Sequence, residues 1–284
     1  MTRFTERRRK LRSLLDAGDM LVAPGAFDAV SAKLIERAGF RLVYIGSYAT
    51  AASVLGQPDV GILTLDDLVD RAGTIASAVE VPVIADAENG FANAANIWRT
   101  VQAFERAGIA AIHIEDQEFG KHADVPQVLA PLETIVQKIR AALDAREDPN
   151  FLIIARTDAV LAHNDVDEAV RRMRAFLEAG ADLVFPAGMR AADLERVRDR
   201  IPGKVVVTDK PGCTTEEERR AGADLVLYYG FTLYAAYGAV ERALADFHAS
   251  GDADATGVRE AASDFEQFIG YDAFVGRARK YGLA

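Results

Sequence analysis

One eleven-residue segment, residues 105–115, reads Glu105-Arg106-Ala107-Gly108-Ile109-Ala110-Ala111-Ile112-His113-Ile114-Glu115. It contains the end of a helix, a glycine, a short apolar run and then a carboxylate. Glycine directly after a helix commonly takes the left-handed conformation that ends the helix. A short run rich in Ile and Ala is typical of a buried parallel strand. The segment therefore predicts one unit of an alternating α/β fold.

The same unit recurs along the chain. Three other predicted helices end in a similar short sequence before a strand, namely Glu36-Arg37-Ala38-Gly39, Glu178-Ala179-Gly180 and Arg220-Ala221-Gly222. Apolar runs predict eight strands, at 20–23, 41–46, 81–85, 110–114, 151–155, 183–185, 204–207 and 225–228. Amphipathic stretches predict eight helices, at 26–38, 64–78, 94–107, 132–145, 166–179, 191–200, 215–221 and 232–249.

Eight alternating units favour a closed (β/α)₈ barrel, a TIM barrel, over a doubly wound sheet. The alternative is a Rossmann-like sheet with a second domain, but no GxGxxG pattern follows the first strand. After the last predicted helix comes a polar stretch of small residues, 250–257, which reads as a hinge. Residues 258–281 read as helical and carry large apolar side chains that must be buried on their own barrel or on a neighbour's. We therefore expect a catalytic barrel over 1–249 and, in the same domain, a hinge and helical arm over 250–284.

Composition excludes several classes of function. The formal net charge of −10 and the pI of about 5.0 argue against a nucleic-acid partner. The single cysteine, Cys213, allows no intrachain disulfide and no Cys/His zinc cluster, and we interpret it as structural. No apolar run approaches the roughly 18 residues of a membrane helix, and the basic N-terminus is not followed by the apolar segment of a signal peptide. We predict a cytoplasmic protein without a membrane partner.

Polar residues follow three adjacent predicted strands, where a barrel of this type carries its chemistry. Asp86 and Glu88 follow the third strand, Glu115 the fourth and Arg156 the fifth. Carboxylate oxygens gathered in one place select Mg²⁺ or Mn²⁺, and the planar fork of Arg156 matches a substrate carboxylate. Any one acid alone could be a helix cap or loop residue, and Arg156 could be a structural ion-pair partner. Their common register favours a site, to which Ser47 after the second strand could add hydrogen-bond donors.

At these residues the chain resembles the isocitrate lyase / phosphoenolpyruvate mutase superfamily over essentially its whole length. The matching segments are Gly46-Ser47, Leu55-Gly56-Gln57-Pro58-Asp59, Val81-Pro82-Val83-Ile84-Ala85-Asp86, Asn96-Ile97-Trp98-Arg99-Thr100-Val101, His113-Ile114-Glu115-Asp116-Gln117 and Ile153-Ile154-Ala155-Arg156-Thr157-Asp158-Ala159. Agreement of four spaced motifs in barrel order is improbable by chance, so together these segments are specific for the superfamily.

The resemblance implies a homotetramer built from dimers, a C-terminal helix exchanged between subunits, and an active-site Mg²⁺ that binds a 2-oxo carboxylate as its enolate forms. It implies that Arg156 grips the carboxylate or enolate oxygen of the substrate. The residues it assigns to the metal shell are Asp59, Asp86, Glu88 and Glu115, and those it places beside the substrate are Ser47, Tyr48 and Ala49.

The chain departs from the superfamily pattern in the gating loop. The lyases carry a Lys-Arg-Cys-Gly-His run there, whose cysteine protonates the departing carbanion. Here Lys121 matches the lysine but Ala123 stands at the cysteine position, and the asparagine of the mutases is absent too. We predict Lys121 as a catalytic residue and His122 as a substitute proton donor, with an exposed loop histidine as the alternative. Glu88 replaces the second aspartate of the superfamily's Asp-x-Asp, which preserves the charge.

Two further substrate contacts of the methylisocitrate lyases are missing. Phe185-Pro186-Ala187 lacks their glutamate after the sixth strand, and Thr208-Asp209-Lys210-Pro211-Gly212 replaces their Asn/Glu-Gly pattern after the seventh. A tricarboxylate would lack its usual partners, whereas decarboxylating a compact 2-oxo diacid needs only a metal electron sink and an arginine. The superfamily's oxaloacetate decarboxylases also lack the cysteine of the gating loop, and their pattern after the seventh strand is similar to the one here.

The sequence thus predicts a Mg²⁺-dependent carbon–carbon lyase for a small 2-oxo or 2-hydroxy dicarboxylate, acting through an enolate. Oxaloacetate decarboxylase-like chemistry comes first and methylisocitrate lyase-like cleavage second. The alternatives are a phosphoenolpyruvate or phosphonopyruvate mutase, a phosphonopyruvate hydrolase, or a protein that binds such a ligand without turnover. The sequence does not decide whether Tyr228 and Tyr229 line the pocket or pack.

Overall fold

The computed structural model describes residues 2–118, 121 and 127–283. The chain divides into two compact units, Met1–Thr232 and Leu233–Ala284. The first unit contains every strand and the predicted site, and the second contains most of the last long helix and the C-terminal arm. Among the described residues, no helix is both long and apolar enough to cross a membrane.

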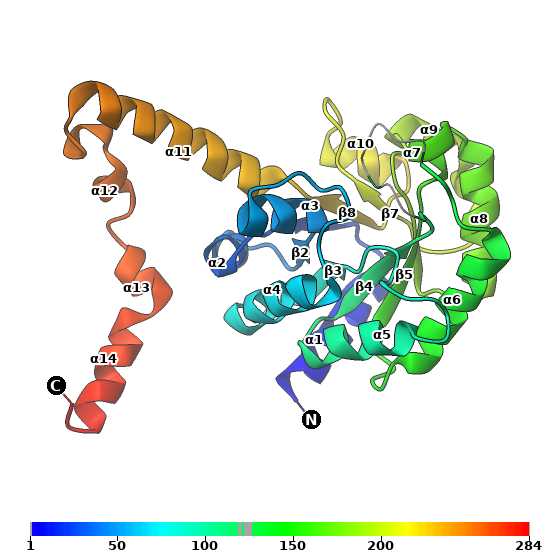
Figure 1. Ribbon diagram of the computed structural model, residues 1–284, viewed down its shortest axis with the longest axis horizontal. Helices are drawn as coiled ribbons and strands as arrows, with labels where there is room; N and C mark the ends of the chain where they lie inside the picture. Colours follow the sequence, from blue (N-terminus) through cyan, green and yellow to red (C-terminus); the bar gives the residue numbers. More distant parts are fainter. Residues whose placement is uncertain (1, 119–120, 122–126, 284) are drawn as a thin grey trace. The chain divides into compact units, whose positions relative to one another are not determined.

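Eight parallel strands form the first unit. In chain order they are β1 (Leu21–Pro24), β2 (Val43–Ile45), β3 (Val83–Asp86), β4 (Ala111–Glu115), β5 (Leu152–Thr157), β6 (Leu183–Pro186), β7 (Val206–Thr208) and β8 (Leu225–Tyr228). Their ladders run in the orders β1-β8-β7 and β2-β3-β4-β5-β6. Parallel bridges from Gly25 to Tyr44 and from Val184 to Val205 join these two groups at both sides. The circuit is closed, and the predicted (β/α)₈ barrel is confirmed (Figure 1).

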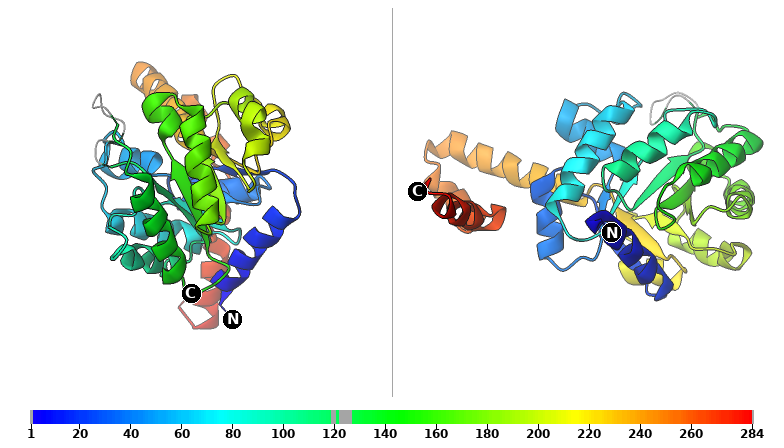
Figure 2. Two further views of the ribbon diagram at one scale, coloured as in Figure 1. Left: turned by 90° about the vertical axis from the view of Figure 1, so that its right-hand side faces the viewer. Right: turned by 90° about the horizontal axis from the view of Figure 1, so that it is seen from below.

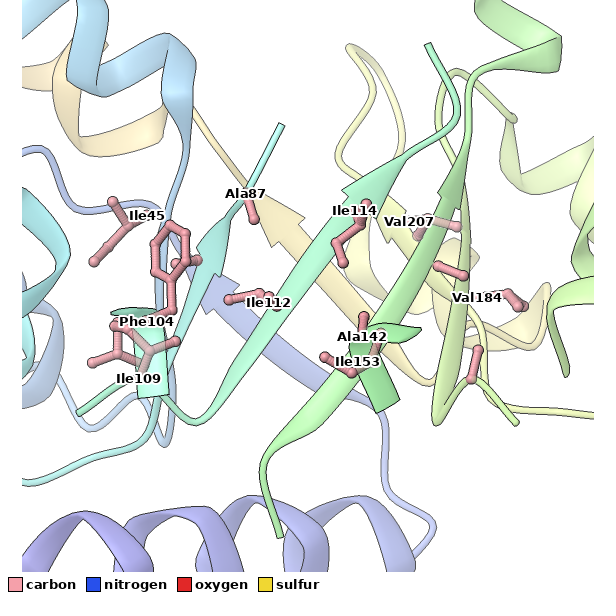
Figure 3. Close-up of a cluster of buried hydrophobic side chains, with 14 of the residues drawn as sticks. Ile45, Ala87, Phe104, Ile109, Ile112, Ile114, Ala142, Ile153, Val184 and Val207 are labelled. Carbon is pink, nitrogen blue, oxygen red and sulfur yellow. The ribbon is translucent and has the colours of Figure 1, made fainter. Parts of the chain in front are cut away.

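Side chains alternate along each strand between the barrel interior and the surrounding helices. The interior cluster takes one set of positions, such as Ile84, Ile154 and Leu227. The outer cluster takes the other set, including Ile112 and Ile114 of β4, which pack toward the helices (Figure 3). The alternation continues past the apolar part of each strand. Polar side chains at the interior positions near the strand ends therefore also point into the barrel.

The helices predicted between the strands are present, with ends that differ by a few residues. They are α2 (Ala29–Arg37), α4 (Leu65–Ala78), α5 (Ile97–Arg106), α6 (Leu132–Ala145), α8 (Val166–Glu178), α9 (Ala191–Val197), α10 (Thr215–Arg220) and α11 (Phe231–Ser250). Capping boxes begin three of these helices, and their N-cap residues are Asp28, Thr64 and Thr214. The predicted helix 191–200 ends early, and its last turn is the 3₁₀ segment η2 (Arg198–Arg200).

Four further helical segments were not predicted: α1 (Arg3–Asp16), α3 (Ser47–Thr50), the π-helical turn η1 (Ala51–Leu55) and α7 (Ala159–His163). The helix α1 lies at the amino ends of the strands (Figures 1 and 2). Its Leu11 and Leu15 are buried in the interior cluster, and Arg8 donates to the carbonyl oxygen of Ile109 at 3.0 Å. The basic N-terminus therefore closes the floor of the barrel.

The second unit consists of most of α11, the 3₁₀ turn η3 (Asp254–Thr256) and three short helices. These are α12 (Val258–Ala261), α13 (Phe265–Ile269) and α14 (Tyr271–Lys280). Gly257 and Gly270 interrupt the predicted helical arm with φ angles of 70° and 96°. Large apolar side chains of this unit, such as Tyr237 and Phe274, are more than half exposed in the single chain. The compact barrel unit ends at Thr232, and the expectation that a catalytic barrel over 1–249 and an arm over 250–284 form one domain stays a prediction.

Candidate active site

The predicted site residues lie at the carboxyl ends of neighbouring strands. Asp86 ends β3 and Glu115 ends β4, while Arg156 is the penultimate residue of β5. In the ladder, Asp86 pairs with His113 and Glu115 pairs with Arg156. All four side chains occupy inward positions of the alternation, so strand register alone brings them together at the mouth of the barrel.

Three carboxylates form a compact buried group. Asp86, Glu88 and Glu115 can each place one oxygen within 4.8 Å of the others. Their exposed fractions are 3%, 7% and 2%. Glu88 lies beyond the end of β3 in a left-handed conformation with φ of 51°, and its N–H donates to Asp86 Oδ1 at 2.8 Å. This tight turn returns the Glu88 carboxylate to the cluster.

Lys121 supplies one positive charge to this cluster. Its Nζ donates to Glu88 Oε2 at 2.5 Å and to Ser47 Oγ at 2.9 Å. The same ammonium lies 3.6 Å from Asp59, 3.7 Å from Asp86 and 3.8 Å from Glu115. Burial lowers the pKa of Lys121, but these surrounding carboxylates raise it well above its usual value. One ammonium therefore faces four acids and stays charged.

The acids are not fully compensated. Burial, together with the negative charges of Asp86 and Asp59, raises the pKa of Glu88 to about 7. Burial, with Asp158 and Glu88 nearby, raises the pKa of Glu115 to about 8. Burial also disfavours ionised Asp86, but His113, which is protonated at the low pH where Asp86 titrates, together with Lys121 and Arg156 outweighs that effect and holds the pKa of Asp86 below the usual range. The cluster has more negative charge than its lysine and arginine neutralise.

Arg156 is engaged mainly by another acid. Its Nε and Nη2 donate to the two carboxylate oxygens of Asp158 at 2.7 and 2.9 Å. Its Nη1 lies 3.0 Å from Glu115 Oε2. Gln117 also donates to Asp158 and helps to hold that carboxylate. The structural ion pair left open by the sequence is therefore present, and substrate recognition by Arg156 stays a prediction that rests on Nη1.

The residues after β2 approach the cluster from another side. The Oγ of Ser47 lies 2.8 Å from Asp86 Oδ2 and 3.0 Å from Asp59 Oδ2. The ring of Tyr48 is edge-on to the ring of Tyr229, with centroids 5.5 Å apart. Ala49 is buried and is not among the residues that line the cavity described next.

A cavity of about 380 Å³ opens above the cluster. Its size suits a small-molecule ligand. Polar groups on its wall come from the predicted site, and apolar groups come from the β5 and β6 side. The lining residues include Ser47, Tyr48, Asp59, Asp86, Lys121 and Arg156 as well as Leu161, Phe185, Ala187, Gly188, Thr208, Lys210 and Tyr229.

Tyr44 lines the cavity, and its hydroxyl contacts the buried His113. The hydroxyl of Tyr44 and Nε2 of His113 are hydrogen-bonded at 2.9 Å, and His113 Nδ1 lies 3.6 Å from Asp86 Oδ1. Burial lowers the pKa of His113 to about 4, so its ring is neutral at pH 7. His113 is the buried core residue that the sequence indicated, although it lies directly beneath an acid of the site.

The model of the family described as phosphoenolpyruvate phosphomutase matches residues 11–248. The chain belongs to this family. Solved structures that resemble it are described as members of the PEP mutase/isocitrate lyase superfamily, so the predicted superfamily is confirmed.

Three relatives illustrate the range of activities in the family. A 2,3-dimethylmalate lyase from Eubacterium barkeri is 44% identical over 230 residues, which are 79% of this chain and 78% of the relative. An oxaloacetate acetylhydrolase solved with 3,3-difluorooxalacetate has a TM-score of 0.89 at 27% identity, covering 99% of this chain and 98% of that one. A phosphonopyruvate hydrolase solved with oxalate and Mg²⁺ has a TM-score of 0.88 at 30% identity, covering 99% of both chains.

The carboxylates of this family member fit a hard divalent cation. Glu88 Oε1 is buried and forms no hydrogen bond among the described residues, and Glu115 Oε2 is paired only through the ion pairs with Arg156 and Lys121. An all-oxygen donor set that carries excess negative charge selects Mg²⁺ or Mn²⁺ over softer metals. Asp86, Glu88 and Glu115 are the residues that could hold the ion, and Asp59 could contact it through water.

Sequence reasoning left several cavity residues unassigned. Thr208 and Tyr229 line the cavity two residues beyond the interior positions Val206 and Leu227, so extending the alternation past the apolar run would have found both. Tyr228 instead packs against the outer cluster. Lys210 lies in a loop, where no such rule applies. The predicted proton donor His122 and its neighbour Ala123 lie outside the described residues.

Proposed function

We propose that the protein is a Mg²⁺-dependent carbon–carbon lyase that cleaves a small alkyl-substituted 2-hydroxy dicarboxylate of the 2,3-dimethylmalate type. The observation that carries the proposal is the buried group Asp86, Glu88 and Glu115 beside Lys121 at the mouth of the barrel. A resident divalent ion would polarise the oxygen of the substrate that becomes a carbonyl. The 44% identity to a 2,3-dimethylmalate lyase supports this substrate class over the oxaloacetate decarboxylation that the sequence placed first.

Cleavage of such a substrate has a simple balance. The hydroxyl at C2 loses its proton, the C2–C3 bond breaks, and C2 becomes the carbonyl carbon of a 2-oxo acid. The bonding electrons leave with C3 as an enolate-type carbanion, which takes up a proton to give a second carboxylic acid. Two proton transfers are therefore needed, each worth about 10²- to 10⁴-fold in rate when a positioned group performs it.

This chain's own residues suit parts of that scheme. Lys121 has its ammonium at the centre of the acids and would stabilise negative charge that develops on the substrate. Glu88 and Glu115, whose pKa values in the metal-free protein are raised to about 7 and 8, would release their protons when the cation binds and would then hold it. We retain His122 as the proposed donor to carbon because Ala123 replaces the cysteine. His122→Gln should then lower kcat more than it raises KM, and unchanged kcat would remove the assignment.

Parallel assays test the reaction class. Purified protein with Mg²⁺ is incubated with 2,3-dimethylmalate, 2-methylisocitrate, oxaloacetate or phosphonopyruvate, and the release of pyruvate, or of phosphoenolpyruvate from phosphonopyruvate, is followed. We expect the highest kcat/KM with 2,3-dimethylmalate and no turnover in excess EDTA. Turnover of phosphonopyruvate alone would replace the lyase by chemistry at a P–C bond, which the phosphomutase family match makes the second candidate. Samples without enzyme correct for spontaneous decarboxylation of oxaloacetate.

We also propose the assembly and location that the resemblance implied. The exposed apolar side chains of the C-terminal unit, including Tyr237, Phe265 and Phe274, support its burial on a second subunit. A homotetramer with exchanged C-terminal helices would bury them. Sedimentation velocity of the full chain tests this assembly, and a monomer at micromolar concentration would overturn it. Cytoplasmic location stays a proposal from the sequence, which localisation of the tagged protein in its own cells tests.

A further inference from the structure

Lys210 brings a positive charge to the cavity from the side away from the acids. It lies in the loop that follows β7 and lines the cavity with Thr208 and Tyr229. In a closed barrel of eight strands, β7 is four strands from β3 and thus lies across the mouth from Asp86. The cavity is therefore bounded by Lys121 and Arg156 at one side and by Lys210 at the other.

The loop that carries Lys210 is fixed at both ends. The N–H of Asp209 donates to the carbonyl oxygen of Leu227 at 3.1 Å, and the N–H of Cys213 donates to the carbonyl oxygen of Lys210 at 3.0 Å. The first bond ties the loop to β8, and the second closes a turn around Pro211 and Gly212. The backbone that presents Lys210 is thus held by the barrel.

Lys210 has no close acidic partner. No described carboxylate lies within 4.0 Å of its Nζ, unlike Lys121 with its four neighbouring acids. Burial lowers the pKa of Lys210, and Arg156 and Arg190 act in the same direction. Asp209 and Glu218 oppose burial and the two arginines and favour the charged form. A half-buried ammonium without a paired anion is a ready partner for a ligand carboxylate.

An apolar wall lies beside the positive groups. Leu161 from α7 and Phe185 and Ala187 from the end of β6 line the same cavity. Gly188 allows Leu161 to approach closely, because a Cβ at that position would lie 2.7 Å from Leu161 Cδ2. Such a wall suits methyl or ethyl substituents and offers no partner to a third carboxylate.

We propose that Lys210 binds the distal carboxylate of the substrate, the one farther from the metal-binding acids, and so selects dicarboxylates over monocarboxylates. The inference rests on the proposed function and assigns a role to a residue of the segment in which this chain departs from the methylisocitrate lyase pattern after the seventh strand. Lys210 acts in binding, and the acids and Lys121 act on the bond that breaks. The competing interpretation is that Lys210 serves the neighbouring hollow, which it lines with Arg190 and Arg220.

Two stable four-carbon acids isolate this contact. Malate and 2-hydroxybutanoate share a 2-hydroxy carboxylate, and a methyl group in the second replaces the distal carboxylate of the first. Dissociation constants are measured by calorimetry in saturating Mg²⁺ for the wild type, Lys210→Met, Lys210→Arg and the control Arg190→Met, because Arg190 lines the neighbouring hollow and not this cavity. Oxalate, too short to reach across the mouth, reports on the metal side.

We expect the wild type to prefer malate, and Lys210→Met to weaken malate binding by about 10- to 100-fold, the usual effect of losing a charged hydrogen bond. Binding of 2-hydroxybutanoate and oxalate should change less than about twofold. Lys210→Arg should restore most of the preference, and Arg190→Met should keep it.

Three results would overturn the inference. They are a wild type without preference for malate, a Lys210→Met variant that retains the preference, and a variant that weakens all three ligands equally. Failure of the proposed function looks different, since the wild type would then bind none of the ligands in a Mg²⁺-dependent way and would cleave no dicarboxylate. If the wild type binds oxalate but neither four-carbon acid, the assignment of the metal-binding acids is supported and the proposed Lys210 subsite is wrong.

Discussion

The two sides of the barrel mouth differ in how their charges are balanced. On the β2 to β5 side, five acids surround Lys121 and Arg156, and every charged group is buried among partners. On the β6 to β8 side, Lys210 lies without a close acid next to Leu161, Phe185 and Ala187. The first arrangement is built for a metal ion and bond cleavage. The second is built for choosing the ligand, so that a change on one side should alter chemistry and a change on the other should alter selectivity.

The largest expected effect comes from removing an acid of the metal side. Asp86→Asn takes away the carboxylate that remains ionised most readily and that Ser47 and Glu88 already hold in place. We expect kcat/KM to fall about 10³-fold, since preorganised charge at a reacting centre has effects of this size. Mg²⁺ affinity, measured by calorimetry, should fall with it. The exposed Asp70→Asn serves as the matched control, and an Asp86 variant with intact Mg²⁺ binding and activity would remove the metal assignment.

Lys121→Met should follow with a loss of about 10²-fold in kcat. Its ammonium contacts the acids directly, so the loss should appear in kcat more than in KM. Removing this positive charge also raises the pKa values of Glu88 and Glu115 further, because both are lowered by Lys121 at present. Lys204→Met is the control, since Lys204 donates to Leu15 at the other end of the barrel. Equal losses in the two variants would mean that Lys121 is only structural.

The pH dependence of Mg²⁺ binding tests the charge imbalance itself. Glu88 and Glu115 have pKa values of about 7 and 8, so both must lose protons for a cation to bind between pH 6 and pH 8. We expect Mg²⁺ affinity to rise at least about tenfold from pH 6 to pH 8. In the metal-free protein the free energy of unfolding changes in the opposite direction with pH. Raised pKa values mean that the folded state holds extra protons above pH 4.5, so stability falls as the pH rises toward 8.

Thermal melts in EDTA and in Mg²⁺ at pH 6 and pH 8 measure both effects. The increase in Tm on adding Mg²⁺ should be larger at pH 8. An increase that is equal at the two pH values would show that these two acids do not release protons to the ion.

The two sides also differ in how far the sequence predicted them. The metal side was predictable because Asp86, Glu115 and Arg156 end apolar strands, where alternation defines the direction of a side chain. Glu88 was predicted because it too follows the third strand, but the left-handed turn that brings its carboxylate to the cluster is signalled by no local pattern. Lys210 was missed because its direction depends on a loop. The helix α1 was missed because its burying face contains Arg7 and Arg8, whose charges hide the amphipathic pattern.

The C-terminal arm shows the same limit at a larger scale. Its apolar residues predicted a helix over 258–281 with a buried face, but a break at 262–264 and Gly270 divide this segment into three short helices. A glycine in a helical pattern does not by itself reveal whether it will take a positive φ. The pattern of apolar residues predicts the structure where packing along one strand or helix determines it. It does not predict the structure where a turn or another subunit determines it.

The smallest expected effect sharpens the comparison from the selective side. Ala187→Glu restores the acid that methylisocitrate lyases carry after Phe-Pro, and it places a carboxylate in the apolar wall near Lys210. Ala187→Gln has nearly the same size without the charge. We expect kcat/KM for a dicarboxylate to be about tenfold lower with Glu than with Gln, because the new carboxylate either repels the substrate or pairs with Lys210. Oxalate and Mg²⁺ binding should be the same in both variants. If Glu and Gln reduce kcat/KM equally, only volume matters at this wall, and the charge of Lys210 has no part in selecting the substrate.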